Sequence, residues 1–219
     1  MIIESDFVPA RWLRNRHAQT IYAAQSWAWR GWPELRREEL RLPDGDVTAV
    51  DWHVGSDDLP DTAPLLIILH GLEGSAESPY ARMFLGAAHA LGWRVCVLHF
   101  RDCGDYSNVL PRRYHAGETN DLRHFLKQLH KMPESAENSG PLMAVGFSLG
   151  GNVLLKYLGE SGDTTPLRAA AAVCVPLDLH TCAKALDQGF SRLYQRYLLK
   201  RMKNSVRAKF DRHTAAFDW

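Results

Sequence analysis

The sequence predicts an α/β protein with a mostly parallel sheet, helices on both faces of that sheet, and an antiparallel hairpin near the N-terminus. Short continuous apolar runs, typical of strands buried on both faces, alternate with segments whose apolar residues recur at helical spacing. The first two strand-like segments instead alternate apolar with polar residues around a turn. Strands that alternate with helices favour a parallel sheet, whose ligands bind at the carboxyl ends of the strands.

The hairpin comes first along the chain. Residues 38–42 and 47–53 alternate apolar and polar side chains on either side of Pro43-Asp44-Gly45-Asp46, a run of turn-forming residues. We expect these two segments to be antiparallel edge strands.

Four apolar runs then predict buried strands at residues 65–69, 95–100, 142–145 and 169–175. Between the first two strands, Ser78-Pro79 supplies a helix N-cap and a first-turn proline, and Gly92 ends the apolar helical pattern. A second helix follows Thr119 and Asn120, and a third follows Gly151. The predicted order is a hairpin followed by β-α-β-α-β-α-β.

Composition excludes several classes of protein. The 219 residues are 46% hydrophobic and 23% charged with a net charge of +1, as in a globular protein with no general affinity for nucleic acid. No signal peptide or membrane span is recognisable, so the expected location is the cytoplasm. The four cysteines lack metal-ligand spacing and the ten histidines form no zinc motif, so we expect reduced thiols and no metal.

The strongest chemical motif is Gly146-Phe147-Ser148-Leu149-Gly150, placed between a predicted strand and a predicted helix. A G-x-S-x-G sequence in that context is typical of a nucleophile elbow, in which a serine lies on a strained turn and needs neighbours without side chains. Ser148 is therefore the candidate nucleophile.

A serine nucleophile also needs hydrogen-bond donors for the oxyanion that forms in the reaction. The backbone N–H of Leu149, directly after Ser148, is one candidate donor. The second is the N–H of Leu72, in the glycine-bearing segment His70-Gly71-Leu72-Glu73-Gly74-Ser75 that follows the first parallel strand. An ordinary strand-to-helix turn would have a similar sequence.

Four segments make the chain resemble the α/β-hydrolase fold, and within it the YheT-like esterase family with its ABHD1/2/3-type lipases. They are residues 7–20 with W-L-R-N-x-H-x-Q-T, residues 70–75, residues 99–119 with Y-H-x-G-E-T, and residues 146–152. The resemblance implies a serine carboxylic-ester hydrolase that acts on short- or medium-chain acyl esters, or on lipid-like esters, without a cofactor. It also implies a Ser, Asp, His triad in that chain order.

The triad acid and base of such enzymes follow two further strands beyond a helical lid, whereas only 71 residues follow Ser148 here. We therefore expect the last two strands and the triad Asp and His to be missing, as in a hydrolase shortened at its C-terminus. Asp178 with His180 or His213 is a substitute pair to consider, while His70 and His115 are expected to be structural. The alternative function is a catalytically incomplete fragment or a non-catalytic scaffold.

Three regions are predicted. Residues 1–37, with Trp27, Trp29 and Trp32, form an arm packed on the core; residues 38–176 form the hydrolase core; and residues 177–219 form a partial helical lid. The lid has an apolar helical stripe surrounded by Lys and Arg, which is either a solvated face or a weak contact site for a membrane surface. Without two further strands, residues 169–175 would form an apolar edge that pairs with another chain or lowers solubility. The sequence does not predict an oligomeric state.

Overall fold

The computed structural model describes residues 2–25, 33–131 and 139–213, and the chain forms two compact units, residues 1–32 and 33–219. The first unit contains η1 (Arg11–Leu13) and α1 (Arg16–Ala23). Helix α1 begins after Asn15, whose side-chain oxygen accepts hydrogen bonds from the first backbone N–H groups of the helix. The tryptophans 27, 29 and 32 lie outside the described residues, so the packing of an arm on the core stays a prediction.

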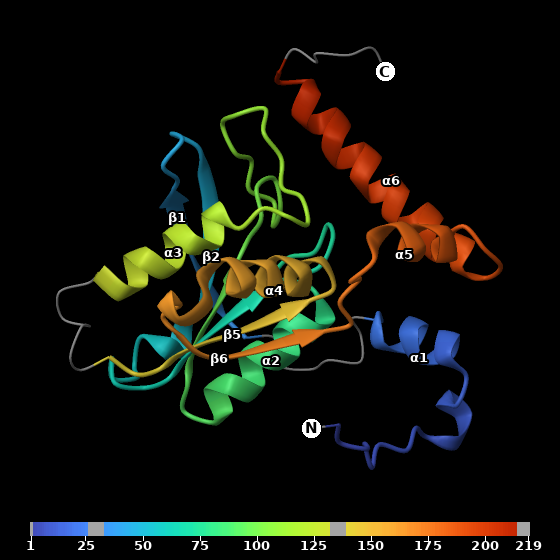
Figure 1. Cartoon of the computed structure of the whole chain (residues 1–219), viewed down its shortest axis with the longest axis horizontal. Coiled ribbons are helices and arrows are strands. Elements are labelled where there is room, and N and C mark those ends of the chain that lie inside the picture. The colour runs from blue at the N-terminus through green and yellow to red at the C-terminus, as the bar shows by residue number, and fades with distance from the viewer. Residues whose placement is uncertain (1, 26–32, 132–138, 214–219) are drawn as a thin grey trace. The chain divides into compact units, whose positions relative to one another are not determined.

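The second unit is built on a six-stranded sheet (Figure 1). Its strands are β1 (Leu35–Arg41), β2 (Val47–His53), β3 (Leu65–Leu69), β4 (Arg94–Leu98), β5 (Leu142–Phe147) and β6 (Leu167–Val173). They lie in the order β1-β2-β4-β3-β5-β6; the β1–β2 and β2–β4 pairs are antiparallel and the other three are parallel. This confirms the predicted fold class with its N-terminal hairpin.

Strand β2 corrects one expectation, because it pairs with both β1 and β4 and is not an edge strand. The polar residues Thr48 and Asp51 of β2 suggested a solvent-facing side, but they are buried and form hydrogen bonds inside the protein. The Thr48 hydroxyl donates to the carbonyl of His99, and the Asp51 carboxylate binds Arg37 and His99. A polar residue in an alternating pattern therefore does not by itself indicate a solvent-facing side.

Helices cover both faces of the sheet (Figure 1). Helix α2 (Pro79–Ala90) packs on one face, and α3 (Asn120–Lys131) and α4 (Leu149–Ser161) pack on the other. Strand β3 contacts both layers because successive side chains point to opposite faces: Leu66 and Ile68 join the α2 core, while Leu65, Ile67 and Leu69 join the α3 and α4 core. The continuous apolar run of this strand is thus explained.

The boundaries of α2 follow the predicted signals. Pro79 occupies the first turn after Ser78, and Gly92 beyond the C-terminal end has a φ of +73°. The Ser78 hydroxyl does not cap the helix; it accepts a hydrogen bond from the backbone N–H of Ser75 at 3.1 Å. Ser78 therefore stabilises the loop that precedes α2.

After β6 the chain forms α5 (Leu179–Leu186) and α6 (Ser191–Phe210). Short 3-10 turns, η3 (Val54–Ser56) and η4 (Gly162–Thr164), complete the unit. In the part of the chain that the structure describes, β6 pairs with β5 alone, and the side chains of its central alanines 169–171 are exposed. No helix among the described residues has the length and apolarity needed to cross a bilayer.

Candidate active site

Ser148 lies on the sharp turn between β5 and α4, with φ +51° and ψ −114°, and it is exposed. A residue with a side chain strains this backbone by roughly 1–3 kcal/mol, so the surroundings must enforce it. Two glycines permit the turn: a Cβ on Gly146 would lie 2.5 Å from the carbonyl oxygen of Gly150, and a Cβ on Gly150 would lie 2.5 Å from that of His70. The backbone N–H of Ser148 donates to the carbonyl of Val173 at 2.8 Å.

The strand order explains why the loop after β3 meets this turn. The chain runs from β3 to β4 on one side and then returns to β5 on the other, so the ends of β3 and β5 form the switch point at which doubly wound sheets bind ligands. A Cβ placed on Gly71 would lie 3.5 Å from the Cβ of Ser148. The loop that carries Leu72 therefore lies beside the candidate nucleophile.

Leu149 is the first residue of α4, so its backbone N–H has no acceptor within the helix. Among the hydrogen bonds of the described residues, the Leu72 N–H has no acceptor either. Both groups are available to a ligand, as oxyanion donors must be.

Two aromatic side chains fix the start of this loop. The Tyr80 hydroxyl accepts a hydrogen bond from the Gly71 N–H at 2.8 Å, and the Tyr80 ring packs on Phe147. His70 is fully buried: its Nε2 accepts from the N–H of Phe100, so the proton resides on Nδ1 and is donated to the Gly71 carbonyl. Burial, reinforced by the neighbouring His99, lowers the pKa of His70 to about 3. His70 is thus a neutral structural group.

Glu73, the next residue but one after Gly71, adopts a φ of +53° and is 8% exposed. The Tyr114 hydroxyl accepts a hydrogen bond from the Glu73 N–H and donates to the Glu73 carboxylate, both at 2.8 Å. The Arg113 guanidinium donates to the same carboxylate at 2.9 Å and to the Ser205 hydroxyl of α6 at 2.8 Å. The loop beside Ser148 is thereby linked to the C-terminal helix.

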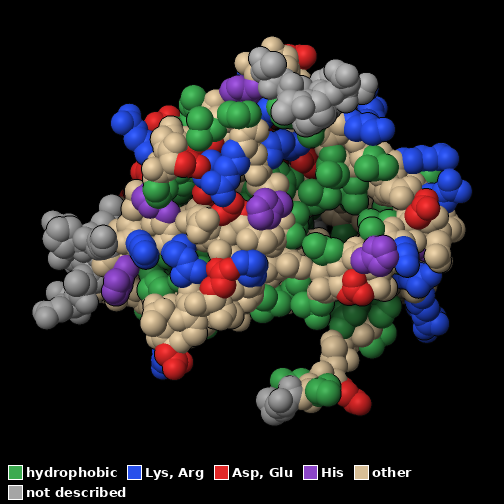
Figure 2. Space-filling model, turned by 45° about the horizontal axis from the view of Figure 1, so that its top comes forward, with side chains coloured by type: hydrophobic (Ala, Val, Ile, Leu, Met, Phe, Trp, Pro, Cys, Tyr) green, Lys and Arg blue, Asp and Glu red, His purple; other side chains and the backbone are tan. Residues whose placement is uncertain are grey.

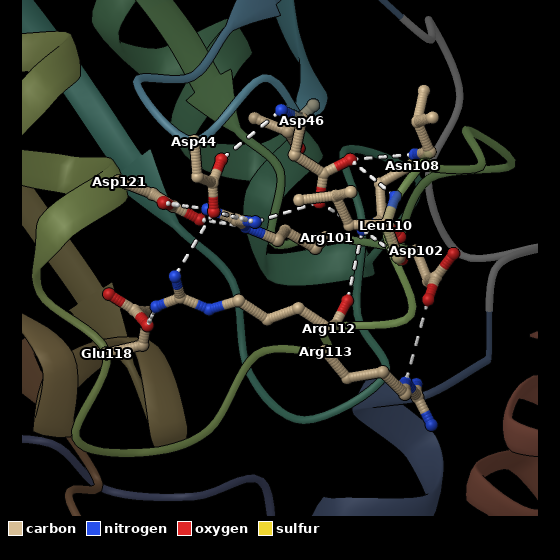
Figure 3. A network of polar contacts seen from close by, with 12 residues as sticks. Asp44, Asp46, Arg101, Asp102, Asn108, Leu110, Arg112, Arg113, Glu118 and Asp121 are labelled. Carbon is tan, nitrogen blue, oxygen red and sulfur yellow. Dashed lines mark hydrogen bonds and ion pairs between the residues drawn. The ribbon is translucent and has the colours of Figure 1, made fainter. Parts of the chain in front are cut away.

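A second polar network joins the loop after β4 to the hairpin turn and to the start of α3 (Figure 3). Arg101 is 2% exposed, and its guanidinium binds the carboxylates of Asp44, Asp46 and Asp121 at 2.7–2.8 Å. Burial opposes the charge, but the hydrogen bonds to Asp121 and Asp44 outweigh it and raise the pKa of Arg101. The hairpin turn, the end of β4 and the start of α3 are held together by this one side chain.

Helix α6 is anchored to the same loop. The Lys209 ammonium is fully buried, pairs with the Asp102 carboxylate at 2.7 Å, and donates to the side-chain oxygen of Asn108 at 2.5 Å. Burial lowers the pKa of Lys209 even though Asp102 opposes that effect. Arg113 and Arg212 also lie near Asp102, at 3.8 and 3.4 Å.

Among the described residues, no histidine ring and no carboxylate is hydrogen bonded to the Ser148 hydroxyl. Asp178 is the N-cap of α5: its carboxylate accepts from the N–H groups of His180 and Thr181 and from the Thr181 hydroxyl. His115 is 68% exposed at its side chain and accepts a hydrogen bond from the Gly117 N–H. The structure thus gives Asp178 and His115 local hydrogen bonds and shows none between either of them and the Ser148 hydroxyl.

No group of three or more His, Cys, Asp or Glu side chains in the described ranges is arranged to hold a metal ion. Cys96 and Cys103 are buried free thiols, and burial raises the pKa of Cys103 to about 12. Cys174 is exposed, directly after β6, instead of being buried in an apolar strand as its sequence context indicated. Around the candidate nucleophile, the described residues therefore offer a serine hydroxyl and backbone N–H groups.

Comparison with known families agrees with this geometry. Residues 64–218 match the family model described as the alpha/beta hydrolase fold. The chain belongs to this family. Within the family, it is 38% identical over 94% of its length to YheT of Escherichia coli (strain K12), named as a candidate esterase, and covers 58% of that protein. It is 30% identical to the phospholipase ABHD3 of Homo sapiens over 79% of this chain and 42% of that protein.

Among solved structures, an esterase of Pyrococcus furiosus, Pf2001, matches with a TM-score of 0.57 and 20% identity, over 80% of this chain and 62% of that chain. At that identity the likeness supports the fold alone. The expected YheT-like branch is therefore shown by the sequence relatives, and the chain spans about half the length of the curated relatives it matches.

Sequence reasoning missed the groups that hold the loop, namely Tyr80, Glu73, Arg113 and Tyr114. Tyr114 begins the Y-H-x-G-E-T motif and Arg113 precedes it, within one of the segments that carried the family resemblance. The resemblance therefore marked these residues, but it did not predict their contact with Glu73. Partners separated by 41 residues leave no local pattern from which their contact could be predicted.

Proposed function

We propose that this protein is a serine carboxylic-ester hydrolase. Ser148 attacks the acyl carbonyl, the N–H groups of Leu149 and Leu72 stabilise the oxyanion, and water then releases the acid. The observation that carries the proposal is the strained turn at Ser148, φ +51°, beside the loop that contains Leu72. A backbone conformation that costs free energy persists where the surroundings enforce it, and such sites cluster at catalytic groups.

The substrates we propose are short- or medium-chain acyl esters, or lipid-like esters. Relatives named as an esterase, a phospholipase and a monoacylglycerol lipase support this class. The exposed apolar residues of α6 are compatible with a substrate that is partly apolar.

A second candidate function is a non-catalytic scaffold of the same fold. The observation that favours it is that no base contacts the Ser148 hydroxyl among the described residues. Without a base, a serine hydroxyl is a weak nucleophile.

A fluorophosphonate probe separates the two functions. The enzyme labels covalently at Ser148 and cleaves p-nitrophenyl esters of short acids, and Ser148→Ala abolishes both reactions. Ser107→Ala, at another exposed serine, is the matched control and keeps both. Absence of labelling and of ester cleavage in a folded sample would contradict the hydrolase and leave the scaffold.

A further inference from the structure

Helix α6 carries five cationic side chains in one row. Arg192, Arg196, Lys200, Lys203 and Arg207 follow one another at intervals of four, four, three and four residues. With 3.6 residues per turn, this spacing puts all five on one side of the helix. The helix contains no Asp or Glu, although the whole chain has a net charge of only +1. The row is therefore a local concentration of positive charge.

This basic row faces away from the core. All five side chains are exposed, and no carboxylate of the described residues forms an ion pair with any of them. Lys209, which helical geometry sets roughly opposite the row, is fully buried against Asp102. This anchor fixes the rotation of α6 and leaves the basic row toward solvent.

Apolar side chains are exposed beside the basic row. Leu193 and Tyr197, one turn apart on α6, are 51% and 59% exposed. Leu177, two residues before α5, and Leu179, its first residue, are 80% and 52% exposed. Figure 2 shows hydrophobic side chains next to Lys and Arg side chains at the upper right, the side on which Figure 1 draws α5 and α6. Exposed apolar residues next to a cationic row are characteristic of helices that lie at a membrane surface.

We propose that α6 docks on an anionic lipid bilayer. The basic row binds lipid headgroups, and Leu193 and Tyr197 enter the boundary between headgroups and acyl chains. A nucleic acid or an acidic protein would attract the same cations, but the exposed leucines would contribute nothing to a contact made by charge alone. An anionic lipid surface uses both features at once, because its headgroups attract the cations and its acyl chains accept the apolar side chains. This docking goes beyond the reaction proposed at Ser148 and does not depend on it.

Co-sedimentation with vesicles tests the proposal. The protein binds vesicles of phosphatidylcholine mixed with phosphatidylglycerol and does not bind vesicles of phosphatidylcholine alone. The triple variant Arg196→Gln, Lys200→Gln, Lys203→Gln keeps helix propensity and lowers the partition coefficient on the order of 100-fold, since each cation near an anionic surface contributes about 1 kcal/mol. Leu193→Gln reduces the fraction that stays bound after salt is added.

Two control variants separate docking through α6 from a general effect of charge and from ester cleavage at Ser148. The triple variant Arg41→Gln, Lys127→Gln, Arg168→Gln removes the same charge from exposed positions elsewhere and keeps wild-type binding. Ser148→Ala also binds as the wild type does, so loss of ester cleavage and loss of docking are separate results. Docking is overturned if anionic vesicles do not bind, if the two triple variants bind equally, or if soluble heparin binds as tightly as the vesicles.

Discussion

The Tyr114 hydroxyl holds Glu73 at two points, because it accepts from the Glu73 backbone N–H and donates to the Glu73 carboxylate, both at 2.8 Å. Glu73 has the unfavourable φ of +53° and stands in the loop beside Ser148. Tyr114 therefore helps to hold the loop that contains the candidate donor Leu72, together with Tyr80, which holds its start.

We expect Tyr114→Phe to lower the free energy of unfolding by about 1–3 kcal/mol, because a buried carboxylate and a buried N–H lose a partner. In an active sample we expect kcat to fall while KM changes little, because the proposed oxyanion donor Leu72 lies in this loop. Urea unfolding and ester hydrolysis measure the two effects. Tyr106→Phe, whose hydroxyl donates to the more exposed Glu39, is the control and should stay within about 0.5 kcal/mol of wild type. Equal effects of the two variants would contradict the assigned role of Tyr114.

Two glycines of α4 provide a matched pair of substitutions. A Cβ on Gly150 would lie 2.5 Å from the His70 carbonyl oxygen, whereas a Cβ on Gly159 would meet nothing within 4 Å. Gly150→Ala should destabilise the fold by several kcal/mol, on the order of other overpacked sites. Gly159→Ala should stabilise it by about 0.5–1 kcal/mol through helix propensity. Thermal melts of both variants measure these changes in stability. A Gly150→Ala variant as stable as the wild type would mean that α4 does not approach β3 so closely.

The buried pair of Lys209 and Asp102 is open to a double-mutant cycle. Lys209→Met alone should cost about 3 kcal/mol, because it leaves the Asp102 carboxylate buried with only the more distant Arg113 and Arg212 nearby. Adding Asp102→Asn should restore part of that loss. Denaturant unfolding of the two single variants and the double variant gives the coupling energy; purely additive effects would rule out the pairing.

His70 makes stability depend on pH. The pKa of His70 is about 3 in the folded state against about 6.5 in an unfolded chain, so between these values the unfolded state binds a proton that the folded state does not. The free energy of unfolding therefore rises with pH in this window, by at most about 1.4 kcal/mol per pH unit. Stability is complete above about pH 6.5 and falls as the pH drops toward 3. Burial lowers the pKa of His53 too, which adds an effect of the same sign.

Urea unfolding at about pH 7 and about pH 5 should differ by about 2 kcal/mol on account of His70. His70→Gln keeps a polar side chain at the position but cannot titrate, so its stability should vary less over this range. An equal pH dependence in the variant would show that His70 is not the titrating group.

The sequence predicted those parts of the fold that depend on residues close together in the chain. The apolar run at residues 65–69 and the glycines around Ser148 predicted a buried strand and a strained turn, since each depends on neighbouring residues. Charge pairing was not predictable in this way. Asp46 is fully buried because it binds Arg101, 55 residues away, and Asn108, 62 residues away. The turn sequence Pro43-Asp44-Gly45-Asp46 indicates exposure, and only the fold reveals the cations and amides that surround it.

The conformation of Ser148 has a wider consequence. Nothing in a serine favours φ +51°; the approach of α4 to β3 and the hydrogen bond from Ser148 to Val173 keep it there. A substitution that loosens the packing of α4 on β3, or that removes this hydrogen bond, should therefore let the turn relax. In such a variant the reactivity that we propose for Ser148 should fall while circular dichroism still reports a native fold.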